Sequence, residues 1–224
     1  MRTAEGQLVE VFLDEGGRIL CPADLIPAPG QYLLAYADAP DQLLPASIFS
    51  AESISGGFLA APPLPPKWSP GTHLHLRGPL GHGFSLPATA RRVALVAYDV
   101  SPARLRGLIA PAFAQEAAIV IVGDTAPLDL PESVEIQPLT ALAEVYAWAD
   151  YVALDVARGG LPELREKLRL AGKTAAKNEA QVLVRTPLPC GALAECGVCA
   201  VTVGSGWRAA CKDGPVFELR ELTQ

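Results

Sequence analysis

The spacing of apolar residues divides the chain into parts with different predicted structures. Across residues 1–90, short runs in which apolar and polar residues alternate are separated by glycine and proline, a pattern typical of short strands joined by turns. The clearest runs are residues 8–13, 29–34 and 71–77, and the glycine-rich residues 78–83 predict a tight turn. Strands at such close spacing favour a small antiparallel barrel or sandwich.

Near residue 91 the pattern changes to continuous apolar runs that alternate with helical segments. Continuous runs indicate strands buried on both faces, and their alternation with helices favours a parallel α/β unit. Ser101 and Pro102 suit the start of the first helix, and Pro111 should kink or end that helix. We predict strands at residues 92–98, 117–122, 133–137 and 151–156, and helices at residues 102–115, 141–149 and 161–171.

The chain is long enough for more than one domain, since its 224 residues exceed the common domain size of roughly 100–150 residues. We expect three units. These are an all-β barrel at residues 1–90, a central parallel α/β domain at residues 91–178, and a small cysteine-rich module at residues 179–224. Residues 173–180, rich in lysine and alanine, mark the transition to the last unit.

Composition and charge exclude several classes of function. The net charge is −6 and no basic patch is present, so nucleic acid is not an expected partner, because its phosphates need clustered lysine and arginine. No apolar run approaches the roughly 18–20 residues of a membrane span, and residues 1–17 carry charges where a signal peptide is apolar. We therefore expect a cytoplasmic protein. In that compartment cysteines serve metal binding or catalysis more often than disulfides.

Four of the five cysteines lie within the last 35 residues, as Cys190, Cys196, Cys199 and Cys211. Their spacing, C-x5-C-x2-C-x11-C, is close to the plant-type arrangement C-x4-C-x2-C…C that holds a two-iron, two-sulfur (2Fe–2S) cluster. Structural zinc also takes four cysteines, usually from two short pairs, and only Cys196 and Cys199 form such a pair. We predict a 2Fe–2S cluster, with zinc as the alternative, and no Rieske centre, since no histidine lies near. Cys21 is predicted to be a small buried apolar residue.

Two segments near the C-terminus resemble a known family. Residues 190–201 and residues 210–217 (ACKDGPVF) are similar to the end of the electron-transfer subunit of class 1B dihydroorotate dehydrogenase. Earlier segments, residues 29–32 (PGQY), Gly71-Thr72 and residues 78–84 (GPLGHGF), are similar to its barrel. The resemblance implies a ferredoxin-reductase-like β-barrel, an NAD-domain-like α/β unit and a 2Fe–2S module. It also implies FAD in the barrel, NAD(H) at the α/β unit and a catalytic partner subunit that contains FMN.

The match to the family's flavin site is partial. The family has arginine before its Pro-x-Ser segment, where a guanidinium pairs with the FAD pyrophosphate, but Leu44 stands there in this chain. Lys67 or Arg77 is the expected substitute, and Ser47 and Thr72 also suit ordinary strand and turn positions. The residues that the resemblance assigns to the flavin are Pro45, Ser47, Gly71 and Thr72.

The nicotinamide site departs further from the family's pattern. The family has a glycine-rich turn after the first α/β strand, which lets the backbone approach the dinucleotide. Residues 96–102 contain no glycine, and Asp99 would bring a negative charge near a phosphate. Residues 154–158 (LDVAR) stand where such reductases carry Cys-Gly-Pro. We therefore expect NAD(P) binding to be weakened or absent.

These features predict an electron-transfer subunit rather than an independent enzyme. The cluster would pass single electrons between a flavin and a partner oxidoreductase, most directly the dihydroorotate dehydrogenase B complex of pyrimidine biosynthesis, in a hetero-oligomer. The chain needs no acid–base or nucleophilic residue, because cofactors carry the redox chemistry. Three alternatives stay open: a complete FAD enzyme that accepts hydride from NAD(P)H, a paralogous subunit of another oxidoreductase, and an assembly subunit whose cysteines hold zinc or a structural cluster.

Two further features carry weaker signals. His73 and His75 share one face of a predicted strand, as metal ligands can, but the sequence offers no third ligand, so we expect surface or barrel-lining residues. Trp207, close in sequence to the cysteines, suits either a partner interface or packing against the cysteine loop.

Overall fold

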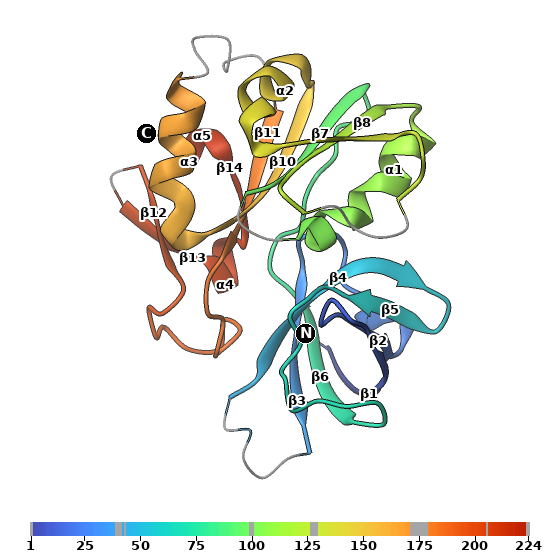
Figure 1. Cartoon of the computed structure of the whole chain (residues 1–224). Helices are drawn as coiled ribbons and strands as arrows, with labels where there is room; N and C mark the ends of the chain where they lie inside the picture. The colour runs from blue at the N-terminus through green and yellow to red at the C-terminus, as the bar shows by residue number, and fades with distance from the viewer. Residues whose placement is uncertain are drawn as a thin grey trace.

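The chain folds into a barrel, an α/β sheet with helices on both faces, and a cysteine-containing module that lies beside both (Figure 1). This arrangement confirms the predicted fold class. Asp99 and most of the segment 173–180 lie outside the described residues. The computed structural model describes residues 2–38, 42, 44–98, 101–125, 130–170, 179–204 and 206–222, with only the backbone of residues 169 and 170.

The N-terminal part of the chain forms a closed barrel of short strands. The strands are β1 (Arg2–Val11), β2 (Gly17–Leu20), β3 (Tyr32–Ala37), β4 (Ala46–Ile54), β5 (Gly57–Ala60) and β6 (His73–Leu80), and a 3₁₀ helix, η1 (Ala23–Leu25), follows β2. Their order around the barrel is β1-β2-β5-β4-β3-β6, with antiparallel neighbours throughout. Alternate side chains such as Leu8, Ile48 and Leu76 fill the interior, and each large buried side chain contributes about 1.5–3 kcal/mol.

The glycine-rich segment 78–83 is not wholly a turn, which corrects the prediction. Its first three residues continue β6, where Gly78 pairs with β1 and Leu80 pairs with β3. A Cβ at Gly78 would lie 2.5 Å from Leu33 Cδ2, so the strand passes this point because the residue has no side chain. The last residues of β6 thus remain paired with both neighbouring strands.

The second unit is a six-stranded sheet. Its strands are β7 (Arg92–Ala97), β8 (Ala118–Val122), β9 (Val134–Gln137), β10 (Tyr151–Ala157), β11 (Glu179–Arg185) and β14 (Val216–Glu218). The order across the sheet is β14-β11-β10-β7-β8-β9, and all neighbours are parallel except β14, which is antiparallel to β11. Both β11 and β14 lie beyond the predicted boundary at residue 178. The C-terminal part of the chain therefore completes the sheet.

Helices cover both faces of this sheet. They are η2 (Pro102–Leu108), α1 (Ile109–Ala114), η3 (Leu139–Ala141), α2 (Leu142–Trp148), η4 (Arg158–Gly160) and α3 (Leu161–Leu170). Leu105 of η2 packs on one face and Val145 of α2 on the other. Contrary to prediction, the first helix continues past Pro111, which lies in the first turn of α1 where its missing N–H is not needed. No helix among the described residues is long and apolar enough to cross a membrane.

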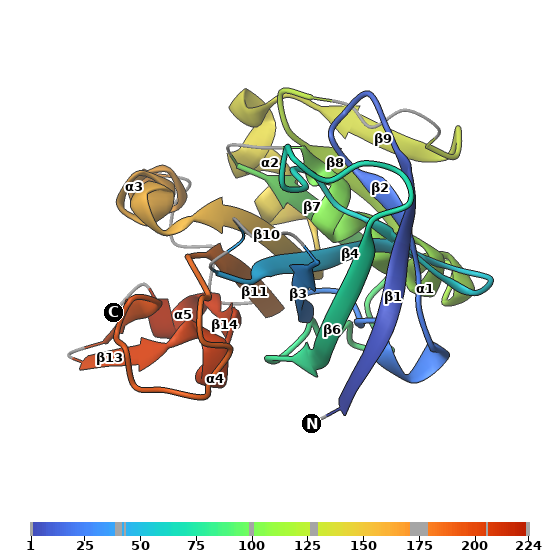
Figure 2. The same cartoon turned by 90° about the horizontal axis from the view of Figure 1, so that it is seen from below.

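One apolar core runs through all three units. It joins Phe49 of the barrel and Val96 and Leu183 of the sheet to Cys199 and Cys211. Figure 2 shows the C-terminal module on the side of the molecule where barrel strand β3 meets β11. Tertiary packing therefore fixes the positions of these cysteines. The module consists of β12 (Ala200–Val203), β13 (Gly206–Ala209), α4 (Ala210–Asp213) and α5 (Leu219–Leu222).

Candidate metal centre

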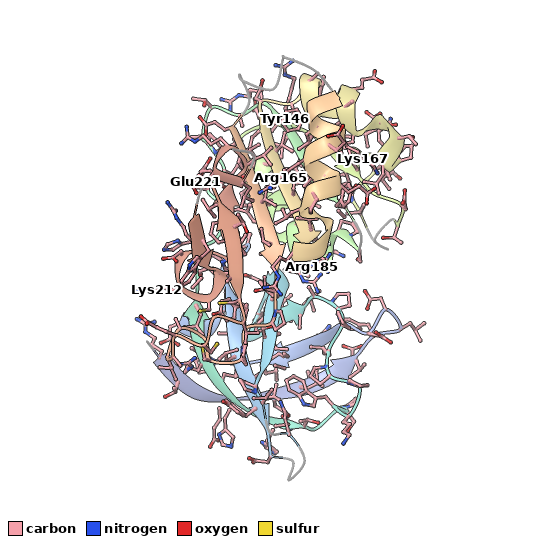
Figure 3. The ribbon with its side chains drawn as sticks, turned by 90° about the vertical axis from the view of Figure 1, so that its left-hand side faces the viewer. Tyr146, Arg165, Lys167, Arg185, Lys212 and Glu221 are labelled. Atoms are coloured by element: carbon pink, nitrogen blue, oxygen red, sulfur yellow. The ribbon has the colours of Figure 1, made fainter. Side chains whose placement is uncertain are left out.

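Four cysteines come together in the C-terminal module, between β11 and β14 of the sheet. Cys190 and Cys196 lie in the loop after β11, Cys199 directly precedes β12, and Cys211 lies in α4. The β12–β13 hairpin carries the chain away from Cys199 and back, and the Ala210 N–H donates a hydrogen bond to the Cys199 carbonyl (3.1 Å). In Figure 3 the sulfur atoms gather near the labelled Lys212, next to the barrel strands.

The four thiols form two pairs. The sulfur atoms of Cys190 and Cys196 are 3.8 Å apart, and those of Cys199 and Cys211 are 3.3 Å apart. The second pair is 2 % and 4 % exposed, whereas Cys196 is exposed. A 2Fe–2S cluster takes two thiolates on each iron, and two pairs supply this. Cys190 and Cys211 also interact across the two pairs, so all four thiols belong to one group.

The loop around the first pair turns backbone N–H groups toward sulfur. Gly191, Ala192 and Gly197 all have positive φ (+50°, +68° and +72°), a conformation that glycine adopts without steric cost. Burial raises the pKa of the Cys190 thiol, but hydrogen bonds from backbone N–H groups and from the Cys196 and Cys211 thiols together outweigh it, so this pKa lies below its usual value. Hydrogen bonds of this kind stabilise thiolates that ligate a metal.

The net shift of the Cys211 pKa is in the opposite direction. Burial, followed by the hydrogen bond with Cys199, raises the pKa of the Cys211 thiol to about 12. This thiol holds its proton until a metal displaces it, so metal binding here releases a proton. Thiolates are the soft ligands that iron–sulfur clusters and zinc take. The donor set of four neighbouring thiols fits an iron–sulfur cluster.

Two barrel residues hold the backbone of the two cysteine pairs. Arg77 on β6 donates hydrogen bonds from Nη2 to the carbonyls of Cys190 (2.8 Å) and Gly191 (3.0 Å). The Tyr32 hydroxyl on β3 donates to the carbonyl of Cys211 (3.3 Å). Each cysteine pair is thus linked to the barrel by hydrogen bonds from one barrel side chain. The sequence suggested that Arg77 pairs with a flavin phosphate. The alternation of apolar and polar residues along β6 does not indicate that Arg77 contacts the cysteine loop instead.

Arg158 forms the corresponding contact on the side of the sheet. It follows β10 directly, and its Nη1 donates to the carbonyls of Val198 (2.9 Å) and Ala200 (3.0 Å), the two residues that flank Cys199. Arg158 belongs to residues 154–158, which stand where related reductases carry Cys-Gly-Pro. This departure from the family's pattern therefore supports the cysteine loop.

The barrel contains a cavity next to part of the predicted flavin site. Its volume is about 540 Å³, and Pro45, Thr72 and Lys67 are among the residues that line it. That volume lies within the range of small-molecule sites. The predicted donors already have partners: the Gly71 N–H donates to a carbonyl of β1 (2.7 Å), and the Thr72 hydroxyl donates to a carbonyl within its own turn (2.7 Å). These residues fit a phosphate of FAD only in part, and their flavin role stays a prediction.

Ser47, the remaining residue of the predicted flavin site, lies closer to the cysteine loop. It is on β4 and pairs with Leu34 of β3. Phe49, two residues further along β4, contributes its side chain to the core between the units. Leu34 packs so closely on the loop that a Cβ at Gly191 would lie 2.5 Å from its Cδ1. A flavin held at Ser47 would therefore border the metal centre.

A buried group of charged side chains lies near the carboxyl ends of β7 and β10. Ligands of open α/β sheets bind at such a point, where the strand order reverses. Asp155 is fully buried there, between Arg104 (Nη1 to Oδ2, 3.4 Å) and Arg185 (Nε to Oδ1, 2.7 Å). Arg104 also donates to the carbonyl of Pro62 in the barrel (2.6 Å). Figure 3 shows Arg185 at the junction of sheet and barrel.

The buried carboxyl of Asp155 predicts a specific pH dependence of stability. Burial raises its pKa to about 6, although Arg104 lowers it. The unfolded carboxyl titrates near about 3.9, so between these values the folded state binds more protons, and the free energy of unfolding falls as pH rises. Between pH 5 and pH 7 we expect this group to lower stability by about 1 kcal/mol. Urea unfolding of the wild-type protein and Asp155→Asn at both pH values measures it, and an identical pH dependence would contradict the assignment.

Three further sequence-based expectations concern single side chains. His73 and His75 lie on β6 and are exposed, and His75 Nε2 is 2.8 Å from Asp38 Oδ1. Trp207 on β13 is 69 % exposed, which favours a partner interface over packing against the loop. Cys21 is partly buried against the barrel core, and burial raises the pKa of its thiol to about 11, as expected for an unreactive cysteine.

The cysteine-containing segment also matches a known sequence family. Residues 190–223, which include all four cysteines, match the iron–sulfur cluster binding domain of dihydroorotate dehydrogenase B. The C-terminal module is therefore similar to this iron–sulfur domain. Together with the barrel and the sheet, the match confirms the resemblance to an electron-transfer subunit of the dihydroorotate dehydrogenase B type.

Solved structures share the fold of the whole chain at low sequence identity. The NADH-dependent reduced ferredoxin-NADP oxidoreductase is 20 % identical, with a TM-score of 0.74 over 97 % of this chain and 89 % of the other. The ferredoxin reductase of carbazole 1,9a-dioxygenase is 15 % identical (TM-score 0.60, 80 % and 68 % covered). An Amycolatopsis cytochrome P450 reductase is 13 % identical (TM-score 0.56, 82 % and 70 % covered). The iron–sulfur domain is thus attached to a ferredoxin-reductase-like fold.

Proposed function

We propose that the chain is an electron-transfer subunit that relays single electrons through a 2Fe–2S cluster held by Cys190, Cys196, Cys199 and Cys211. The observation that carries this proposal is the gathering of the four thiols into one group, within a segment that matches an iron–sulfur domain. When bound, the cluster supplies the one-electron chemistry. The chain ligates it, directs N–H groups to sulfur and buries the Cys199–Cys211 pair, while the exposed side at Cys196 stays accessible to a partner.

The proposed partner is an FMN-containing catalytic subunit of the dihydroorotate dehydrogenase type, in a hetero-oligomer that serves pyrimidine biosynthesis. The surface around the cysteines supports a protein partner, because Leu193, Val198 and Trp207 are 69 %, 44 % and 69 % exposed. Exposed apolar and aromatic side chains are enriched where proteins associate. Purification of the complex from its native cell identifies the partner. A different oxidoreductase in that complex would instead assign the chain to a paralogous system.

We also propose FAD on the barrel, near Ser47 and the cavity lined by Pro45. The Gly71 and Thr72 donors have internal partners, and Leu44 replaces the family's arginine, so we expect FAD to bind weakly and to be lost in part during purification. Flavin extraction and its absorbance spectrum measure the amount that remains. A full equivalent of tightly bound FAD would show that other groups anchor its phosphates.

The metal is tested by anaerobic purification, metal analysis and electron paramagnetic resonance. Two irons and two sulfides per chain are expected, together with a paramagnetic signal that appears when dithionite adds one electron to the cluster. One zinc ion per chain and no such signal would overturn the electron-relay proposal and would support an assembly subunit instead.

NADH is not expected to reduce the isolated chain. Asp155 is already paired with Arg104 and Arg185 near the point where the strand order of the sheet reverses, and the start of η2, where a dinucleotide phosphate binds in related folds, is buried. Anaerobic addition of NADH or NADPH should leave the visible spectrum of the oxidised cluster unchanged, whereas dithionite should bleach it. Rapid bleaching by NADH would instead favour a complete FAD enzyme.

A further inference from the structure

Arg77 couples the barrel to the cysteine loop through a charged group. Resting on the proposed 2Fe–2S function, we propose that Arg77 is a positioning residue that raises the reduction potential of the cluster. It lies on β6, and its Nη2 donates to the carbonyls of Cys190 and Gly191 at 2.8 and 3.0 Å. Its guanidinium is therefore held beside one of the four ligating residues by two hydrogen bonds.

The position of Arg77 is fixed by close packing. A Cβ at Gly191 would lie 2.2 Å from Arg77 Nη2 and 2.5 Å from Leu34 Cδ1, so the loop rests directly on the guanidinium and on the barrel wall. Positive φ at Gly191 and Ala192 lets the chain turn away from this contact and present N–H groups to sulfur. The same few residues thus place a positive charge on one side of Cys190 and amide donors on the other.

The sign of the effect follows from charge. Arginine stays protonated at any pH that the protein tolerates. A cluster with four thiolates is negatively charged, and reduction adds one more negative charge, so a nearby positive group stabilises the reduced form more than the oxidised form. Arg77 is partly buried, which limits screening by water and salt. The guanidinium therefore favours reduction of the cluster by whichever flavin donates the electron.

Arg158 provides a matched control. It also donates two hydrogen bonds to carbonyls of the cysteine loop, those of Val198 and Ala200, but it is exposed. Water screens the charge of an exposed side chain more strongly. If hydrogen bonds to the loop alone set the reduction potential, replacing either arginine would shift the potential by a similar amount. If the charge sets it, replacing Arg77 would cause the larger shift.

The test is a redox titration of the purified chain, followed by the visible spectrum and the paramagnetic signal. At a fixed applied potential, Arg77→Gln is expected to lower the ratio of reduced to oxidised cluster about tenfold, a shift of about 59 mV for one electron. Arg77→Lys, which keeps the charge, should retain most of the original potential. Arg158→Gln should shift it less than Arg77→Gln does.

Two results would overturn the proposal. The first is an unchanged potential in Arg77→Gln with an intact cluster signal. The second is loss of the cluster from both Arg77→Gln and Arg77→Lys, which would make the role of Arg77 purely structural. Absence of any cluster from the unsubstituted chain would contradict the proposed function instead, so the two failures are distinguishable.

Discussion

Cys211→Ser is expected to remove most of the iron and the visible absorbance of the protein. Cys211 is 4 % exposed and its sulfur lies 3.3 Å from that of Cys199, so no other thiol can take its place at the buried pair. Each iron of the cluster takes two thiolates, and a serine hydroxyl keeps its proton at neutral pH. Iron and sulfide analysis after anaerobic purification measures the loss, and the paramagnetic signal of the reduced protein should disappear with it.

The control for this substitution is Cys21→Ser. Cys21 lies against the barrel core, away from the other cysteines in the fold, and its thiol is unreactive at neutral pH. The barrel variant should keep the full iron content and the same signal. A Cys211→Ser protein that retains two irons and an unchanged spectrum would remove Cys211 from the ligand set.

Gly191→Ala is expected to have the second largest effect, on both stability and cluster content. The residue has φ +50°, and an alanine in this left-handed region costs about 1–2 kcal/mol. The new Cβ would also lie 2.2 Å from Arg77 Nη2 and 2.5 Å from Leu34 Cδ1. The loop must therefore move off the barrel, which releases the carbonyl of Cys190 from Arg77. Urea unfolding and iron content together measure this loss.

Gly197→Ala separates the two contributions. Gly197 has φ +72°, and no atom lies within 4 Å of a Cβ built there. It therefore carries a similar conformational cost, in the same loop, without the contact with the barrel. We expect Gly197→Ala to lose less stability and less iron than Gly191→Ala. Equal losses in the two variants would mean that the packing of Gly191 on the barrel contributes nothing.

Local pattern was sufficient to predict most of the strands and the gathering of four cysteines near the C-terminus. Continuous apolar runs such as residues 92–98 are buried on both faces, and a cysteine spacing encodes ligand chemistry directly. The effect of Pro111 on the first helix was less well predicted. Proline can interrupt a helix or lie in its first turn, and the 3₁₀ segment before α1 places Pro111 in the first turn. The Gly71 N–H bonds to β1 and the Thr72 hydroxyl bonds within its own turn, and an isolated Gly-Thr pair in the sequence predicts neither contact.

Contacts between distant parts of the chain could not be predicted. Arg77 and the carbonyl of Cys190 are 113 positions apart, and Tyr32 and Cys211 are 179 apart. No local periodicity links such residues, since they meet only when the barrel docks on the sheet. The buried group of Asp155, Arg104 and Arg185 was missed for the same reason. One indirect signal was present: an aspartate inside an otherwise apolar run implies a buried partner for its charge.

The core shared by barrel, sheet and cysteine module constrains how the protein matures. During synthesis the barrel and the first five strands of the sheet leave the ribosome before Cys211 and β14. Until those last residues arrive, apolar side chains such as Phe49 and Leu183 lack part of their packing. Complete ligation of iron therefore waits until Cys211 has been synthesised, and a chain that lacks β14 would expose apolar side chains to the cell's quality-control proteases.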